Sequence, residues 1–245
     1  MKRCKSVKDG VNSLIIKNQA SIKSSWDYLK GGSKDLTDSV TIGSLTYPLF
    51  YWRFDPQVEA IERNARKNIG GSISLKISGV IAKDYSLEAF LYKALDIAEW
   101  ALGSEIKKLT AYVNKNAANV ILLMKNDKVA SLELSSCLKK GTPEQTRITA
   151  WGMEGMESTR VVSTKIRPES IYLFTNKTTP YTYNDATIDL YGLTLDDATK
   201  AVAIYKLLNS DSDLSFYLER DKKLKYYIEK VFESDKTNES IIFRR

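Results

Sequence analysis

The sequence predicts an α+β fold in which one large, mainly antiparallel β-sheet is flanked by helices. The main observation is a change in apolar spacing after Gly103, from the helical period to alternation at every second residue. Segments between residues 105 and 175 carry this alternation and are rich in β-branched and aromatic residues. A second observation is that helical patterns precede and follow this run. Strands in consecutive order beside marginal helices are typical of a sheet covered on one face.

The first elements are short. Residues 9–17 (DGVNSLIIK) predict a turn followed by a buried strand, and residues 21–30 (SIKSSWDYLK) predict a helix capped by Ser21. Residues 39–54 contain a predicted strand on each side of Gly43. The N-terminal region is therefore expected to alternate strand and helix.

Two helices with clear end signals come next. Asp55 is the expected N-cap of a helix whose first position is Pro56 and which ends at Gly70-Gly71, where left-handed backbone costs little. Residues 86–102 form the clearest amphipathic pattern of the chain and end at Gly103.

The sheet and the closing helices complete the prediction. Lys125–Lys128 reads as a hairpin turn, residues 194–209 as a helix capped by Thr194, and residues 221–234 as a last helix. The expected strands of the large sheet are residues 73–82, 105–114, 119–126, 128–138, 146–153, 159–166 and 169–175.

Composition excludes several classes of protein. The 245 residues are 43% hydrophobic, and no apolar run approaches the roughly 18 residues of a membrane span. The basic start has no apolar stretch behind it, which disfavours a secretory signal. Cys4 and Cys137 are too few for a disulfide framework and suggest free thiols in a cytoplasmic protein. Because the chain has no histidine, we expect no metal site and no histidine acid/base.

The net charge of +7 raises the question of a polyanionic partner. The lysines are spread along the chain, and no aromatic residues alternate with arginines as a single-strand-binding surface would require. A solvated basic surface explains the charge better than a nucleic-acid-binding module, which is kept as the weakest alternative.

The order of several segments resembles the Gfo/Idh/MocA oxidoreductases, which join a Rossmann-type dinucleotide-binding domain to a C-terminal α/β domain. The first segment, GVNSLIIKNQAS, is similar to the family's strand that ends in Glu-Lys-Pro, with Lys17 at the lysine position. The resemblance extends over about residues 10 to 243 and is carried further by YWRFDPQVEAIERNARKNIGGSI, LYKALDIAEWALG, VASLELSS, ITAWGMEGM and IEKVFESDKTNESIIF.

The resemblance implies a division of the chain. Residues 1–48 would be the remnant of the dinucleotide-binding Rossmann-type α/β domain, and residues 49–245 the C-terminal α+β domain for substrate and oligomerisation. Complete members of the family use NAD or NADP, and their phosphate-binding turn needs a G-x-G-x-x-G pattern. The sequence lacks that pattern, and Gly31-Gly32 and Gly70-Gly71 are interpreted as helix stops. We therefore expect no cofactor to bind this chain alone.

The resemblance also places candidate catalytic residues. Lys17 matches a lysine that binds the substrate hydroxyl. The family's aspartate and histidine on the active-site helix correspond to Ala89 and Lys93, and a later aspartate is kept as Asp96. Lys93 is either a substitute proton donor or the partner of Asp96 in an ion pair at helical spacing. For Lys17 two roles are open: binding of the substrate hydroxyl, if another chain supplies the nicotinamide, or a strand-end lysine without function.

A substrate cleft is expected beside these residues. The resemblance places Trp52 and Arg53 at its mouth, and Trp100 follows Asp96 on the same strip of the helix. An arginine beside aromatic rings can also be stacked for packing alone. A carbohydrate or polyol is the ligand class that the resemblance implies.

The sheet suggests a second role. In the family, the exposed face of this sheet packs against its counterpart in a neighbouring subunit, so we expect a homo-oligomer or a partner chain there. Three functions remain: an NAD(P)-dependent oxidoreductase homologue without its cofactor-binding half and inactive alone, a non-catalytic sugar-binding or assembly subunit, and the nucleic-acid-binding module. The side chains that could line the face are Tyr112, Leu122, Met124, Leu132, Leu134, Trp151 and Tyr172.

Overall fold

The chain forms two compact units in a computed structural model. The first unit comprises Met1–Asp55 and Asp185–Lys223, and the second comprises Pro56–Asn184 and Leu224–Arg245. The residues that the structure describes are 4–22, 24–32, 35–67, 71–142, 144–159, 171–175, 190, 192–210 and 214–243.

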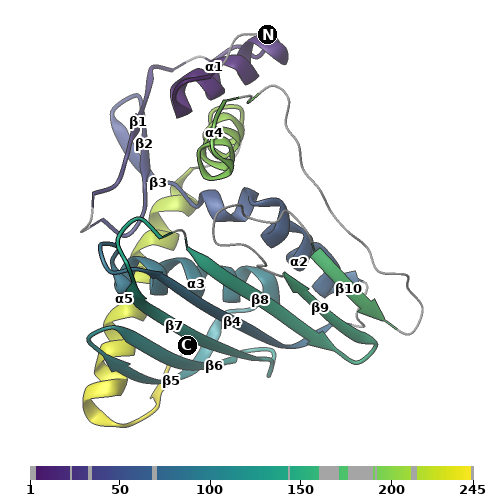
Figure 1. Ribbon diagram of the computed structural model, residues 1–245, viewed down its shortest axis with the longest axis vertical. Helices are drawn as coiled ribbons and strands as arrows, with labels where there is room; N and C mark the ends of the chain where they lie inside the picture. Colours follow the sequence, from purple (N-terminus) through teal and green to yellow (C-terminus); the bar gives the residue numbers. More distant parts are fainter. Residues whose placement is uncertain are drawn as a thin grey trace. The chain divides into compact units, whose positions relative to one another are not determined.

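The first unit combines a small antiparallel sheet with two whole helices and the first part of a third, α5 (Ser215–Thr237) (Figure 1). The sheet has the order β1-β2-β3, and α1 and α4 pack against each other. Its core consists of small and medium apolar side chains from these elements, among them Val11, Val40 and Ile204, which have no exposed surface. The elements are α1 (Val7–Lys17), β1 (Trp26–Leu29), β2 (Ser39–Ile42), β3 (Leu45–Pro48), the 3-10 turn η1 (Tyr51–Phe54) and α4 (Leu195–Leu208).

The strand expected within residues 9–17 is wrong, because this segment lies in helix α1. Ser6 caps the helix by accepting a hydrogen bond at its Oγ from the Asp9 backbone N–H, at 3.2 Å. The buried residues Val7, Val11 and Leu14 lie at helical spacing on one side. The local sequence Leu14-Ile15-Ile16 suggested a strand. The segment is a helix because this places its apolar side chains on one face, which packs on α4.

The helix expected at residues 21–30 is also wrong, because Trp26–Leu29 form strand β1. Tyr28 pairs with Val40 across the strands, and its hydroxyl donates to the Asp38 carboxylate at 2.8 Å. Gly31 follows this strand and is therefore not a helix stop. Its N–H donates to Asp38 at 2.7 Å, and a Cβ there would lie 2.9 Å from the Thr37 carbonyl oxygen.

The division into units does not follow the predicted break after residue 48. It falls after Asp55, and Asp185–Lys223 join the first unit because α4 packs against α1 and η1. The strands described in residues 1–48 are antiparallel, whereas dinucleotide-binding domains are built from parallel strands. Descent of this segment from such a domain stays a prediction.

The second unit contains the large sheet that the sequence predicts. Its order is β10-β9-β8-β4-β7-β6-β5-β11, and only the β4–β7 pair is parallel among these neighbours. The strands are β4 (Ser72–Ala82), β5 (Ile106–Asn114), β6 (Ala117–Met124), β7 (Val129–Leu138), β8 (Gln145–Gly152), β9 (Gly155–Thr159), β10 (Ile171–Thr175) and β11 (Ile241–Ile242). The α+β class and the mainly antiparallel sheet are confirmed. Of the predicted strand 159–166, only Thr159 lies within the described residues.

Helices cover one face of this sheet (Figure 1). They are α2 (Pro56–Lys67), α3 (Leu87–Leu102) and the second part of α5 (Ser215–Thr237). The predicted starts of α2 and α3 and the end of α3 at Gly103, which is left-handed at φ 61°, are confirmed. Thr194 caps α4 as predicted, and the last helix is longer than residues 221–234.

Alternation along the strands separates the covered face from the open face. Four of the residues proposed for the open face, namely Leu122, Met124, Leu132 and Leu134, are at most 2% exposed and belong to the covered face. Sequence alone could not fix the register, and a shift of one residue exchanges the two faces. Tyr112 and Trp151 do lie on the open side, at 60% and 38% exposure. The side chain of Tyr172 lies outside the described part.

Candidate functional site

The helix expected to carry the catalytic residues is α3, which packs on β4, β6 and β7. Ser86 caps it by accepting from the Ala89 backbone N–H, and apolar residues fill the side toward the sheet. Lys93 lies on this helix with its side chain only 18% exposed. Its Nζ donates to the Glu144 carboxylate at 2.8 Å, and the Thr146 hydroxyl donates to the same oxygen at 2.5 Å. The ammonium group is thus held by a carboxylate from the segment before β8.

Asp96 is fully buried, at 0% exposure, and its pairing with Lys93 stays a prediction. The described partner of Lys93 is Glu144, 51 positions along the chain. Helical spacing could not reveal this partner, because it comes from another element. Trp100, the third residue predicted on this strip, is half-buried.

The candidate residues of the first unit are packed rather than arranged around an open cleft. Trp52 is 3% exposed and meets Phe50 edge-on, with ring centroids 5.7 Å apart. The Arg53 guanidinium lies 5.1 Å from the centroid of Phe50 and 5.5 Å from that of Phe216. These contacts match the alternative in which the arginine is stacked for packing.

Lys17 is an exposed residue at the end of α1, not at the end of a strand. A cation in the last turn interacts favourably with the helix dipole. Lys17, Trp52 and Arg53 belong to the first unit, and Lys93, Asp96 and Trp100 to the second. A shared catalytic site for the two groups stays a prediction.

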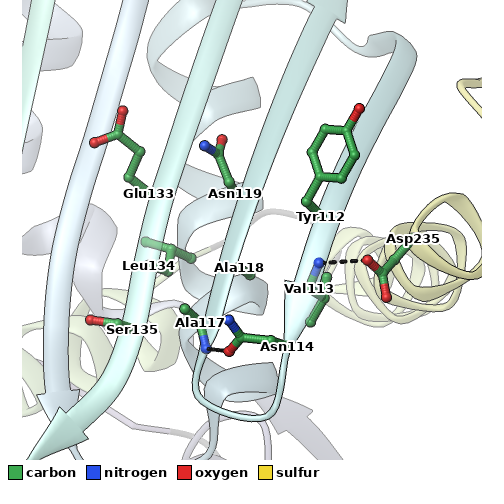
Figure 2. A pocket seen from close by; sticks show the side chains of 10 residues that line it. All are labelled: Tyr112, Val113, Asn114, Ala117, Ala118, Asn119, Glu133, Leu134, Ser135 and Asp235. Atoms are coloured by element: carbon green, nitrogen blue, oxygen red, sulfur yellow. Dashed lines mark hydrogen bonds between the residues drawn. The ribbon is translucent and has the colours of Figure 1, made fainter. Parts of the chain in front are cut away.

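A groove of about 550 Å³ lies on the open face of the large sheet, over β5, β6 and β7 (Figure 2). Tyr112, Asn119 and Glu133 are direct cross-strand neighbours and form one row along it. Asp235 of α5 bounds the groove and accepts a hydrogen bond from the Val113 N–H at 2.7 Å. Of the three side chains in this row, only Tyr112 was predicted for the open face, because only the strand register shows that the three are adjacent.

A buried carboxyl group lies between β9 and α2. Glu157 has no exposed surface, and its Oε1 accepts a hydrogen bond from the Asn64 amide at 2.7 Å. Its Oε2 has no hydrogen-bond partner among the residues that the structure describes. Burial raises the pKa of Glu157 to about 8, against the opposing effects of the Asn64 hydrogen bond and the Arg63 charge.

Among the described residues, no group of three or more side chains could hold a metal ion. No described helix combines the length and the apolar composition of a membrane span. Neither cysteine forms a disulfide within the described residues: Cys4 is buried and Cys137 is exposed.

Comparison with known proteins shows the fold. No family model matches the chain, and no curated protein sequence matches it. Among solved structures, an oxidoreductase from Agrobacterium radiobacter, in complex with NAD+, L-tartaric acid and magnesium, is similar with a TM-score of 0.63 and 15% identity over 98% of this chain and 70% of that chain.

Other solved structures agree. A myo-inositol dehydrogenase from Corynebacterium glutamicum has a TM-score of 0.59 and 20% identity, over 80% of this chain and 64% of that chain. An oxidoreductase domain protein from Kribbella flavida has a TM-score of 0.60 and 10% identity, over 80% and 65%. The chain spans roughly two thirds of the length of these structures, from 64% to 70%. The resemblance to Gfo/Idh/MocA-type oxidoreductases is thus confirmed for the fold.

Proposed function

We propose that these 245 residues act as a non-catalytic subunit with the fold of the Gfo/Idh/MocA-type oxidoreductases, without turnover of their own. The observation that carries the proposal is the Lys93–Glu144 ion pair on the helix expected to hold the acid/base. A general acid must be free to reach its substrate and to exchange its proton. Lys93 is instead engaged by a carboxylate, and the nearby Asp96 is fully buried.

The absence of a dinucleotide fingerprint supports the same proposal. The pattern G-x-G-x-x-G does not occur in the sequence. Gly31, which belongs to one of the few Gly-Gly dipeptides, donates its backbone N–H to the Asp38 carboxylate. Hydride transfer would require NAD or NADP held by residues outside these 245. Action as the substrate-binding half of such a complex is the alternative that we keep.

The open face of the sheet supports an assembly role. One row across β6, β7, β4 and β8 consists of Leu123, Val129, Ser74 and Trp151, with Ile121 in the next row. Ile121, Val129 and Trp151 are 51%, 39% and 38% exposed. We propose that this apolar end of the open face pairs with a second copy or a related chain, because burial of such side chains favours association.

The basic charge has a local explanation that weakens the nucleic-acid alternative. Several lysines form ion pairs with carboxylates on the surface of the second unit, including Lys76 with Glu133 at 2.6 Å and Lys107 with Asp127 at 3.2 Å. The neighbouring carboxylates partly neutralise these lysines, and the basic residues form no continuous run in the sequence.

A double-mutant cycle tests the role assigned to Lys93. The variants are Lys93→Gln, Glu144→Gln and the double variant, with the free energy of unfolding measured by urea denaturation. We expect a coupling free energy of about 0.2–1 kcal/mol in favour of the pair, because both groups are partly solvated. Additive single effects would show that the ion pair does not hold Lys93, and the role proposed for it would be rejected.

Sedimentation velocity tests the assembly role. Trp151→Asp places a charge in the apolar row and should shift an oligomer to monomer at micromolar concentration. Tyr85→Asp is the matched control, since Tyr85 is 63% exposed in the loop before α3 and should leave the oligomer unchanged. A wild-type chain that is monomeric throughout would contradict the proposal.

A further inference from the structure

The carboxyl group of Glu157 has the hydrogen bonding of a neutral acid rather than of a buried anion. Its Oε1 accepts one bond, from the Asn64 amide at 2.7 Å, and no described residue bonds to Oε2. An ionised carboxylate without exposed surface would need donors at both oxygens to offset the loss of water. A neutral carboxyl group loses much less free energy on burial. The geometry around Glu157 therefore favours the protonated form.

Glu99 shows the contrasting arrangement within the same unit. It is also buried, at 6% exposure, but its Oε1 accepts from the Ile106 backbone N–H at 2.7 Å and from the Tyr227 hydroxyl at 2.8 Å. Two donors stabilise a charged carboxylate in the interior. Glu157 has a single described donor, so its burial depends on the bound proton rather than on a set of hydrogen bonds.

The elements packed against β9 supply little compensation for a negative charge on Glu157. They are α2, β8 and β10. The direct cross-strand neighbours of Glu157 are Ala150 on β8 and Leu173 on β10, which carry no charge. Arg63 of α2 acts on it from an exposed position and lowers its pKa, but burial is the larger effect and raises the pKa to about 8.

Helix α2, which bonds to Glu157 through Asn64, depends on packing for its stability. It has 12 residues, and isolated helices of this length are marginal in water. Its side chains Val58, Ile61 and Ala65 are at most 4% exposed, and the helix packs on α3, β8 and β9 (Figure 1). A charge that appears on Glu157 would therefore act directly on the contact that holds this helix.

We propose that Glu157 is a proton-operated latch, whose neutral carboxyl group holds α2 on the sheet and whose ionisation lets α2 open while the rest of the second unit stays folded. In the open form the group meets water, and its pKa returns to the ordinary value of 4.5. A proton that binds the closed form more tightly favours that form. Opening therefore becomes easier as the pH rises from about 4.5 to about 8, and changes no further above it.

Release of α2 would have two consequences. It would expose the apolar side chains Val58, Ile61 and Ala65 to water. It would also lengthen the segment that joins the two units at this point, because α2 begins directly after their division between Asp55 and Pro56.

Amide hydrogen exchange followed by NMR tests the latch. The observable is the protection factor, in which each measured rate is divided into the rate of an unfolded peptide at the same pH. Protection of the α2 amides should fall by up to about tenfold per pH unit between pH 5 and pH 8 and then level off. Amides of β6 should be better protected at every pH. Low concentrations of urea should lower their protection and leave that of α2 unchanged, because local opening exposes little surface.

A matched pair of variants assigns the effect to one residue. Glu157→Gln keeps the size of the side chain but has no proton to lose, so its α2 protection should not change with pH. Glu154→Gln alters an exposed glutamate in the turn before β9 and should reproduce the wild-type profile.

Three results would overturn the latch. One is α2 protection in wild type that does not vary with pH, and another is a variation that persists in Glu157→Gln. The third is α2 protection equal to that of β6 and equally sensitive to urea. In that case α2 would open only with the whole unit, and Glu157 would affect overall stability alone.

Discussion

Glu157, in the second unit, lies in an environment very different from the water that surrounds a free glutamate side chain. Its carboxyl group is buried against α2, with one oxygen bonded to Asn64 and the other without a partner. Because burial disfavours the charged form, the group is protonated in the folded protein at neutral pH, with a pKa of about 8. The stability of the fold should therefore depend on pH through this residue.

The direction of that dependence follows from proton linkage. The ordinary pKa of the group is 4.5, so between about pH 4.5 and pH 8 the folded chain holds a proton that the unfolded chain has lost. The contribution of Glu157 to the free energy of unfolding is fully present below about pH 4.5. It declines by up to about 1.4 kcal/mol per pH unit as the pH rises to about 8.

Glu157→Gln should remove this dependence. Denaturant unfolding from pH 5 to 9 should show the variant gaining stability relative to wild type as the pH rises. The control is Glu154→Gln, an exposed residue in the turn before β9 that should follow the wild-type curve. Parallel curves for wild type and Glu157→Gln would show that the carboxyl is not protonated in the fold.

Residue identities predicted the candidate site only in part. Lys93 and Asp96 are on the predicted helix, but the partner of Lys93 is set by the approach of the segment before β8, which no local pattern encodes. The groove residue Asn119 has no sequence signal either. Its importance comes from β-strand register, which joins it to Tyr112 and Glu133.

At the scale of elements, the edge strand β5 is closed by helix α5. The Ser234 hydroxyl accepts from the Ala111 N–H at 3.1 Å, and Asp235 accepts from the Val113 N–H at 2.7 Å. β11 pairs with β5 only over two residues, next to Leu109 and Lys108. The side chains of α5 thus satisfy donors that a free edge would offer to another strand.

Asp235→Ala should leave the Val113 N–H without its acceptor. We expect a loss of about 1–3 kcal/mol in the free energy of unfolding, because the bond involves a charged acceptor. Asp84→Ala is the control: Asp84 is exposed in the turn after β4, and its loss should cost less than about 1 kcal/mol. Equal losses in the two variants, measured in urea, would contradict the account of the edge.

Elements were predictable where their end signals are strong. Pro56, Ser86, Thr194 and Gly103 gave correct helix ends, because capping is a local property. The first two elements were exchanged, α1 for a strand and β1 for a helix. There the outcome depends on tertiary partners: α4 for α1, and β2 for β1.

At the scale of the whole molecule, each of the two units is built from two separate segments of the chain. Residues 185–223 return to the first unit, which no change in composition announces. The large sheet, by contrast, was predictable because alternation repeats over many strands. The parallel pairing of β4 with β7 could not be predicted, because it depends on the insertion of β4 between β7 and β8.

We propose that this chain has the fold of an oxidoreductase and no turnover of its own. Isothermal titration calorimetry of the 245-residue chain with NAD and with NADP tests it most directly. The account predicts no saturable heat for either nucleotide up to millimolar concentration. Saturable binding with micromolar affinity would contradict it and would make a dehydrogenase the better interpretation.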